Sequence, residues 1–598
     1  SQPPGSRLQR QSYRAKFPSP RAVSSPVRAI TLHMPIDTML PTDVWDYIVV
    51  GGGLAGSVVS SRLLALNNTA KILVIEAGAN AAGRTDILYV NSTNLIQGDF
   101  DWNYFTTPQP QLNNRTIQSA AGKGLGGGSL INTCKLSHGG WMRGARVDYD
   151  EWAELVNDSR WGYDGQLPFF KSSEEFWTKA NADEHGYDGP LKVEVPSITG
   201  RVYPLRDAVY ASYESVGIEA LPGLDANSGQ NLGFGEIAEN RRNGARQIAP
   251  KYYPLDGVTV MTNTLVEKIL LQSDNSSGSG DLVATGVRLA NGTEILGKEI
   301  IAAAGAYRTP QLLMLSGIGP SDELAKHGID IKVESPDVGQ NFADHAFFTY
   351  NWRLSPEYQN VTVDSGNPLF FESQYGLGQP NNFVASFNIE DKAGFIAAIT
   401  EEEGAAPDPA THPLLKNERT LMEGFVLYVN TDPSLPSNST YLTTANVALN
   451  PTSRGSVTLS SADPATAPLI NPNFFASGVD RFVWRDSIRR MTRMMIGGDS
   501  PLSQGIVEAE ATTGGLKPFT LESTDEEIEE RIRASVIGTY HPMGTCAMGK
   551  VVDSNLRVKG VSNLRVVDAS VFPTIITAHI QAAVYALAEQ AAEIIASS

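Results

Sequence analysis

Apolar residues in the first part of the chain are concentrated in short runs. Residues 46–50 and 71–76 are two such runs, rich in valine and isoleucine, and this composition predicts buried parallel strands. Residues 57–66, between them, predict a helix. The pattern therefore predicts a strand–helix–strand unit of the dinucleotide-binding kind. Later apolar segments predict a strand at 299–304 and a helix at 574–595.

A different pattern occupies residues 346–530. Aromatic and polar residues alternate there, and prolines mark turns, which predicts an antiparallel sheet. The alternate spacing favours the sheet core over a substrate-pocket wall for its phenylalanines. Residues 1–40 are rich in Ser, Pro, Arg and Gln without periodicity and predict an extended leader outside the fold. The phenylalanines concerned are Phe370, Phe371, Phe383, Phe387 and Phe395.

Composition changes this picture mainly by excluding partners. The formal net charge is -18 and the sequence pI is about 5.0, so the surface would repel nucleic acid and anionic membranes. No stretch is long and apolar enough to cross a bilayer. Two cysteines, Cys134 and Cys546, are too few for a disulfide framework or a structural zinc site. We expect no metal.

Sequons, rather than cysteines, indicate the compartment. The chain begins with Ser1 instead of Met, which fits a processed protein, and it carries several Asn-x-Ser/Thr sequons. We therefore expect a secreted, N-glycosylated protein. The sequon asparagines are Asn67, Asn91, Asn114, Asn157, Asn275, Asn291, Asn360 and Asn438.

Three glycines, Gly51, Gly53 and Gly56, follow the first strand and precede the helix. Glycine lets the backbone approach a pyrophosphate closely, and the helix N-terminus offers amide donors and a positive dipole. Glu76, about twenty residues further on, can accept hydrogen bonds from a ribose. The motif predicts a bound dinucleotide but fits NAD and FAD equally. The expected contacts are Gly51, Gly53, Leu54, Ala55, Gly56 and Glu76.

A second glycine-rich loop at 122–129 favours FAD, because a backbone without side chains can lie against a flat ring or a diphosphate. This loop and the segment 305–319 resemble the two signature segments of the glucose-methanol-choline (GMC) flavoenzymes. Segments 337–345, 453–459 and 563–570 also resemble family segments, in family order, so the resemblance runs from about residue 46 to residue 595.

The resemblance implies an α/β fold, in which a Rossmann-like FAD-binding domain carries an inserted antiparallel-sheet substrate-binding domain. The FAD-binding domain comprises residues 41–345 and 531–598, and the substrate-binding domain comprises 346–530. One departure from the family pattern predicts a longer loop than usual at 133–141, beside the flavin. The further FAD contacts that the resemblance implies are Gly122, Gly126, Gly127, Ser129, Asn132, Val266, Asp568 and Ala569.

Two family segments near the C-terminus, 540–546 and 577–580, each carry a histidine. The resemblance implies that His541 is the base near the flavin and that His579 is its partner, at a position that holds His or Asn in the family. Alcohol oxidation independently requires a group that takes the hydroxyl proton, and histidine titrates nearest neutral pH. We interpret the other histidines as packed residues, although His345 could lie beside the flavin and His138 could reach the pocket. Neither cysteine is assigned a redox role.

The expected reaction is hydride transfer from a small aromatic or unsaturated primary alcohol to FAD and then to O₂, which gives an aldehyde or lactone and hydrogen peroxide. The resemblance to the fungal secreted aryl-alcohol-oxidase-like branch implies this substrate class. Four alternatives stay open: an FAD-dependent sugar oxidase, a dehydrogenase that reduces a quinone, a lyase that keeps FAD without redox chemistry, and a flavin binder without activity.

Overall fold

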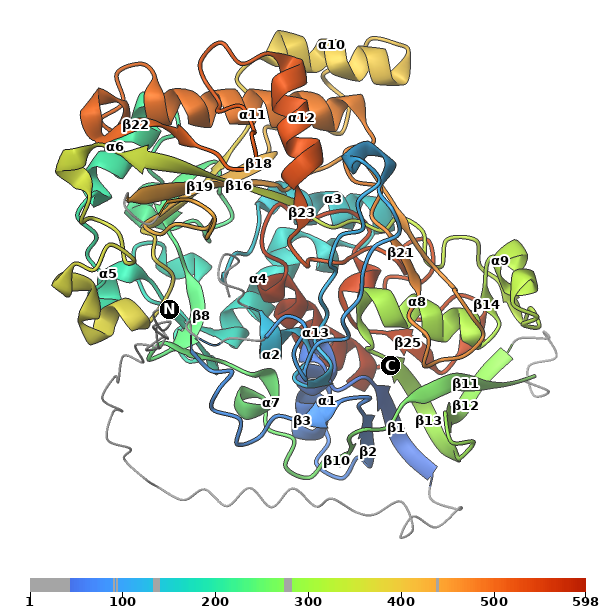
Figure 1. The fold of residues 1–598 in the computed structure, drawn as a ribbon. Coiled ribbons are helices and arrows are strands. Elements are labelled where there is room, and N and C mark those ends of the chain that lie inside the picture. Colours follow the sequence, from blue (N-terminus) through green and yellow to red (C-terminus); the bar gives the residue numbers. More distant parts are fainter. Residues whose placement is uncertain (1–43, 90–91, 93–94, 133–139, 274–281, 437–439) are drawn as a thin grey trace, which may run out of the picture.

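The computed structural model describes residues 44–598 except for 90–91, 93–94, 133–139, 274–281 and 437–439. The described chain forms two large sheets, one mostly parallel and one antiparallel, with helices packed on both (Figure 1). This arrangement confirms the predicted α/β fold class. The predicted leader 1–40 lies outside the described residues, as does most of the predicted long loop.

The first sheet carries the predicted strand–helix–strand unit. Its centre is parallel, because β1 pairs in parallel with both β2 and β13. The predicted strands at 46–50, 71–76 and 299–304 fall in these three central strands, of which residues 48–50, 72–75 and 300–302 are buried. The sheet order is β10 (Thr259–Met261), β2 (Ile72–Ile75), β1 (Val44–Val50), β13 (Glu294–Ala302), β12 (Leu282–Leu289) and β11 (Val266–Ser273), with β24 (Val561–Ser562) and β25 (Leu564–Val566) paired at its side.

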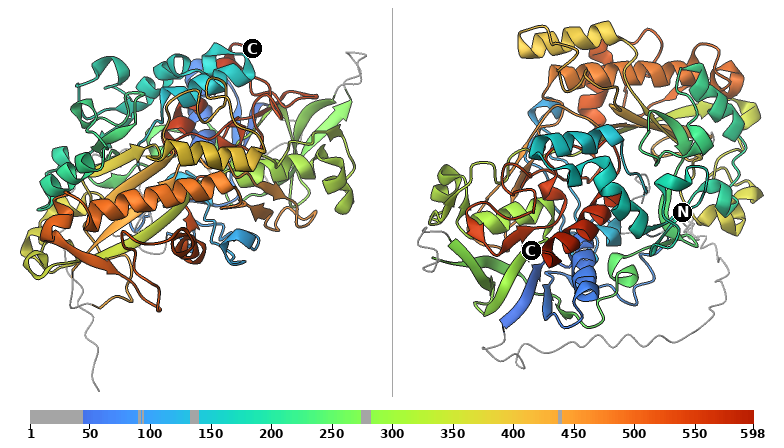
Figure 2. Two further views of the ribbon diagram at one scale, coloured as in Figure 1. Left: turned by 90° about the horizontal axis from the view of Figure 1, so that it is seen from above. Right: turned by 180° about the vertical axis from the view of Figure 1, so that it is seen from behind.

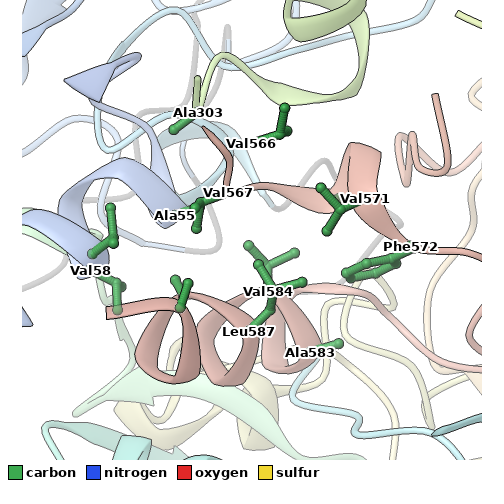
Figure 3. Close-up of a cluster of buried hydrophobic side chains, with 14 of the residues drawn as sticks. Ala55, Val58, Ala303, Val566, Val567, Val571, Phe572, Ala583, Val584 and Leu587 are labelled. Atoms are coloured by element: carbon green, nitrogen blue, oxygen red, sulfur yellow. The ribbon is translucent and has the colours of Figure 1, made fainter. Parts of the chain in front are cut away.

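Two helices from opposite ends of the chain pack together on this sheet. The predicted helix after β1 is α1 (Leu54–Leu66), and it lies against the C-terminal helix α13 (Gln581–Ala596). Figure 3 shows the buried side chains between them, which include Val58, Val584 and Leu587. The helix predicted at 574–595 begins later than expected, at Gln581. The Thr577 amide and hydroxyl both donate to Asp148 Oδ2, at 3.0 and 2.6 Å, so this segment is held outside the helix.

The second sheet is antiparallel throughout, as predicted for residues 346–530. It extends beyond that range, however, because β7 pairs with β17 and β23 pairs with β16. These two strands join the second sheet by pairing with strands that are distant in the sequence, and no local sequence pattern reveals such pairing. The order is β22 (Val507–Ala511), β16 (Ala346–Leu354), β19 (Tyr441–Ala448), β18 (Met422–Leu427), β17 (Phe383–Phe387) and β7 (Gly233–Glu236), with β23 (Ile537–Gly538) beside β16.

Helix α11 (Gly478–Ile496) lies across one face of the antiparallel sheet (Figure 2). Four of the five phenylalanines expected in the core are buried in this layer, and Phe371 is exposed. Other helices around the sheets are α3 (Arg146–Val156), α4 (Tyr163–Ser173), α6 (Arg206–Ser215), α8 (Gly305–Leu315), α9 (Ser321–Lys326), α10 (Lys392–Glu403) and α12 (Asp525–Ser535). Shorter pieces are α2 (Gly128–Ile131), α5 (Pro196–Thr199), α7 (Ala249–Tyr252), β3 (Ala79–Asn80), β4 (Gly124–Leu125), β5 (Glu174–Glu175), β6 (Leu191–Glu194), β8 (Glu239–Arg242), β9 (Ala245–Arg246), β14 (Ile318–Gly319), β15 (Val333–Glu334), β20 (Ser456–Thr458) and β21 (Leu469–Asn471).

Candidate active site

One cavity extends from the turn between β1 and α1 to the start of α13. Most of the predicted cofactor residues and both predicted catalytic histidines line it, so the fold gathers segments from both ends of the chain around one space. The predicted residues in the lining are Gly51, Gly53, Leu54, Ala55, Glu76, Gly122, Gly127, Asn132, Val266, His541, Asp568, Ala569 and His579.

Three predicted contacts, Gly56, Gly126 and Ser129, are not part of the lining. A Cβ atom at Gly56 would lie 1.9 Å from the carbonyl oxygen of Gly51, so this glycine lets α1 pack against the end of β1. The Gly126 amide donates to the Gly52 carbonyl at 2.8 Å, and the buried Ser129 hydroxyl donates to the Gly126 carbonyl at 2.6 Å. These residues stabilise the loops around the cavity.

The two glycine-rich loops contact each other at the cavity wall. Gly127 has a φ of 51°, and a Cβ atom on it would lie 2.7 Å from Gly53 Cα. A Cβ atom on Gly53 would meet only Gly127 Cα, at 3.7 Å, so the rest of the space around it is open cavity. Gly53 is also the N-cap of α1, where free amides and the helix dipole favour an anion. An FAD pyrophosphate fits this cradle.

Glu76 follows β2 and supports the first glycine loop. Its Oε2 accepts from the Gly52 amide at 2.8 Å, and its Oε1 accepts from the Gly78 amide at 2.7 Å. Burial raises the pKa of this carboxyl group. Because a carboxylate can accept about four hydrogen bonds, Glu76 can hold the loop and still accept from a ribose hydroxyl.

Asp568 joins the end of β25 to the first turn of α8. Its Oδ2 accepts from the Gly305 amide at 2.9 Å and from the Thr309 hydroxyl at 2.6 Å, while Oδ1 accepts from the Ser570 amide at 2.8 Å. Burial raises the pKa of Asp568. This residue lines the cavity and also fixes the two segments that form its wall.

His541 and His579 face each other at one end of the cavity. Their ring centroids are 4.9 Å apart and the rings are nearly perpendicular, at 78°. Burial, together with the neighbouring His579 and His345, holds the pKa of His541 well below its usual value. His541 is therefore uncharged at neutral pH, which is the state in which an imidazole can accept a proton.

The sequence did not predict the partner of His579. Its Nε2 lies 2.8 Å from Glu423 Oε1, and Glu423 is wholly buried in strand β18. A ring nitrogen that faces a carboxylate donates its hydrogen to it, and this contact fixes the orientation of His579. The available signal was a lone glutamate within the otherwise apolar segment 421–428, since an ionisable side chain is rarely buried without a partner.

The groups behind His541 were also missed. His345 is wholly buried and lies behind His541 instead of in the cavity lining, with its Nδ1 2.9 Å from His541 Nδ1. The Thr539 hydroxyl lies 3.0 Å from the same atom. Asp344 accepts from the His541 main-chain amide at 2.8 Å, and burial raises the pKa of Asp344 to about 7.

The other predicted features lie elsewhere. His33, His138 and Cys134 are outside the described residues. Cys546 is buried, and burial raises the pKa of its thiol, which fits a packed residue. Among the described residues, no group of His, Cys, Asp and Glu could hold a metal ion, and no helix is long and apolar enough to cross a membrane. The remaining described histidines contact carboxylates: His185 with Glu174 and Asp225, His327 with Glu323, and His412 with Glu403.

Known proteins resemble the chain along nearly its whole length. A GMC-type oxidoreductase, acuG, from Aspergillus aculeatus is 34% identical, and the match covers 92% of this chain and 99% of that protein. Patulin synthase from Aspergillus clavatus is 32% identical over 92% of this chain and 91% of its own length.

Solved structures show the same fold. Pyridoxine 4-oxidase from Mesorbium loti superposes with a TM-score of 0.75 at 27% identity, covering 92% of this chain and 98% of that one. A formate oxidase of Aspergillus oryzae RIB40, studied for its FAD modification, gives a TM-score of 0.78 at 26% identity, covering 93% and 98%. The family model described as GMC oxidoreductase matches residues 45–347 and 451–588. The chain therefore belongs to the GMC oxidoreductase family, and its cofactor is FAD.

Proposed function

We propose that this oxidoreductase is an FAD-dependent alcohol oxidase that acts on a small aromatic or unsaturated primary alcohol. The products are an aldehyde or lactone and hydrogen peroxide. The observation that carries the proposal is the pair His541 and His579, which lie 4.9 Å apart in the lining of the cavity that also contains the FAD cradle.

The two histidines have different roles toward the alcohol. Neutral His541 takes the hydroxyl proton as hydride leaves the carbon, and His579, itself held by Glu423, contacts and orients the substrate hydroxyl. FAD, when bound, supplies the hydride acceptor and passes the two electrons to O₂, which with two protons becomes hydrogen peroxide. The protein positions the alcohol, manages its proton and excludes water.

The residues next to the histidines favour a substrate with an apolar body. Pro542 directly follows His541, Ile580 directly follows His579, and both belong to the same cavity lining. A sugar would need several polar partners to replace its bound water, whereas an aromatic or unsaturated alcohol can pack against such a wall. The similarity to patulin synthase supports the same substrate class. The most specific form of our proposal is therefore the oxidation of ascladiol to patulin.

Anaerobic mixing with a panel of alcohols tests the proposal. Benzyl-type alcohols, ascladiol and glucose are each mixed with the holoenzyme, and the flavin absorbance bands are followed. Bleaching by the aromatic or unsaturated alcohols supports the proposal, bleaching by glucose alone indicates a sugar oxidase, and no bleaching indicates a lyase or a flavin binder. Repeating the reaction with O₂, read as peroxide, and with a quinone, read as hydroquinone, separates an oxidase from a quinone-dependent dehydrogenase.

We also propose that the protein is secreted and N-glycosylated. The sequon asparagines within the described chain are all exposed, as glycosylation requires. Treatment of protein from its native host with an endoglycosidase should lower its apparent mass, and an unchanged mass would argue against secretion. The exposed sequon residues are Asn67, Asn114, Asn157, Asn291 and Asn360, whereas Asn91, Asn275 and Asn438 lie outside the described residues.

A further inference from the structure

The buried side of His541 makes two close contacts at a single ring atom, Nδ1. His345 Nδ1 lies 2.9 Å from it, and Thr539 Oγ1 lies 3.0 Å from it. The proton-accepting role assigned to His541 requires a lone pair on the ring nitrogen that can reach the substrate. The contacts at Nδ1 decide which nitrogen holds that lone pair, because a neutral imidazole carries one hydrogen only.

The Thr539 hydroxyl has a single hydrogen and three acceptors within reach. Besides His541 Nδ1, the main-chain oxygen of His345 lies 3.0 Å away and Asp344 Oδ1 lies 3.3 Å away. If the hydroxyl donated to His541, its oxygen would face two other oxygens without a hydrogen between them. Donation to the His345 carbonyl removes the closer of these two contacts and leaves only the longer one, to Asp344 Oδ1, without a hydrogen. The Thr539 oxygen then accepts from His541, so the hydrogen of His541 lies on Nδ1.

The contact between the two Nδ1 atoms has room for only one hydrogen. Because His541 supplies it, His345 must accept with its own Nδ1 and carry its hydrogen on Nε2. Burial lowers the pKa of His345 to about 3, an effect that the neighbouring His579 and Arg454 side chains reinforce and the main-chain carbonyls of Ile576 and Leu449 oppose. His345 is therefore neutral and able to accept throughout the neutral pH range.

We propose that His345 is a positioning residue that fixes the tautomer of His541, so that Nε2 of His541 holds the lone pair that takes the alcohol proton. This inference rests on the proposed alcohol oxidation. When the proton arrives at Nε2, His541 becomes a cation while its Nδ1 hydrogen still points to neutral His345. The hydrogen bond between them is then charge-assisted and stronger in the transition state than before it.

Two substitutions separate this role from simple packing. His345→Leu removes the acceptor, and we expect the rate of anaerobic flavin reduction by the best alcohol to fall roughly 10- to 100-fold, as for other residues that orient a histidine. His345→Asn places an amide oxygen where Nδ1 was, so it should recover most of that rate. In the Leu variant, KM and FAD content should change little, and the solvent deuterium isotope effect on flavin reduction should rise.

A loss of rate that Asn does not recover, or a Leu variant with the wild-type rate, would overturn the proposal. If the Leu variant does not incorporate FAD, His345→Gln replaces it, because the longer amide resembles Nε2 and leaves the Nδ1 position empty. His345→Gln should then be slow while His345→Asn is fast, and equal rates would again overturn the proposal.

A measurement without turnover keeps this inference separate from the proposed function. In the holoenzyme labelled with nitrogen-15 histidine, the His541 signals can be identified by their loss in His541→Ala, and their chemical shifts report which ring nitrogen is protonated. We expect the hydrogen on Nδ1 in the wild type and a change in the Leu variant. A hydrogen on Nε2 contradicts the inference, whereas failure of every alcohol to bleach the flavin contradicts the proposed function.

Discussion

Replacing Gly53 and Gly56 by alanine should separate binding of the cofactor from packing of the fold. Gly53 is the N-cap of α1 and Gly56 lies in the first turn of that helix, and their surroundings differ. A Cβ atom on Gly53 would meet only Gly127 Cα, at 3.7 Å, and would otherwise project into the cavity. A Cβ atom on Gly56 would lie 1.9 Å from the Gly51 carbonyl oxygen, a distance that requires the backbone to move.

The expected magnitudes follow from these distances. Gly53 has a φ of -68°, which alanine adopts readily, so Gly53→Ala should change the stability of the apoprotein by less than about 1 kcal/mol. If the methyl group displaces one charge-assisted hydrogen bond to the pyrophosphate, FAD binding weakens by about 1.5–3 kcal/mol, or roughly 10- to 150-fold. Gly56→Ala should cost about 1–3 kcal/mol of stability or more, as overpacking does.

Apoprotein stability is measured by thermal unfolding, and FAD affinity by the quenching of flavin fluorescence during titration of the apoprotein. Gly53→Ala should keep the wild-type unfolding temperature without FAD and show a raised Kd. Gly56→Ala should unfold at a lower temperature with and without FAD. Wild-type affinity in Gly53→Ala would place the pyrophosphate elsewhere, and wild-type stability in Gly56→Ala would refute the packing role.

Three further predictions concern the groups that handle the proton. His541→Ala should keep FAD but slow anaerobic flavin reduction by about 10²–10⁴, and His579→Asn should slow it less, because an amide still binds the substrate oxygen. Stopped-flow absorbance measures both, and a larger loss in His579→Asn would reverse the roles. Glu423→Gln replaces a charge-assisted bond to His579 by a neutral one and should lower the reduction rate about 10-fold without loss of FAD, whereas an unchanged rate would remove Glu423 from the mechanism. Asp344 has a folded pKa of about 7, above its unfolded value, so its contribution to stability is complete below about pH 4 and is lost as pH rises to 7. Asp344→Asn should remove this pH-dependent part of the free energy of unfolding, which is on the order of 4 kcal/mol at most. The unfolding temperature of each protein is measured between pH 4 and 8, and the same pH dependence in both would contradict the prediction.

The parts of the fold that could be predicted are those with a local pattern. The first strand, its glycines and the following helix occupy one continuous segment, so hydrophobic periodicity and glycine spacing were sufficient. The strands β7 and β23 could not be assigned in this way, because pairing with β17 and β16 brings them into the second sheet.

The residues of the site also divide into those that a local sequence pattern identifies and those that only contacts across the fold identify. His541 and His579 lie in segments with a family resemblance, whereas Glu423 and His345 are defined only by their contacts. Glu423 meets His579 across 156 positions of sequence, and His345 meets His541 across 196. Sequence spacing cannot reveal a contact of that kind, although a lone glutamate in an apolar strand does indicate that some buried partner exists.

The cofactor cradle and the groups that handle the proton belong to different sheets. The first glycine loop follows β1 of the mostly parallel sheet, and the second loop contacts it at Gly127. By contrast, His345 directly precedes β16, Glu423 lies in β18, and His541 follows β23 of the antiparallel sheet. Of these four side chains, only His579 belongs to a segment that packs on the first sheet, because it lies just before α13, which packs against α1. Substitutions in the second sheet should therefore change proton transfer without changing FAD affinity, and those in the glycine loops should do the reverse. The relative position of the two sheets sets the geometry between the base and the flavin.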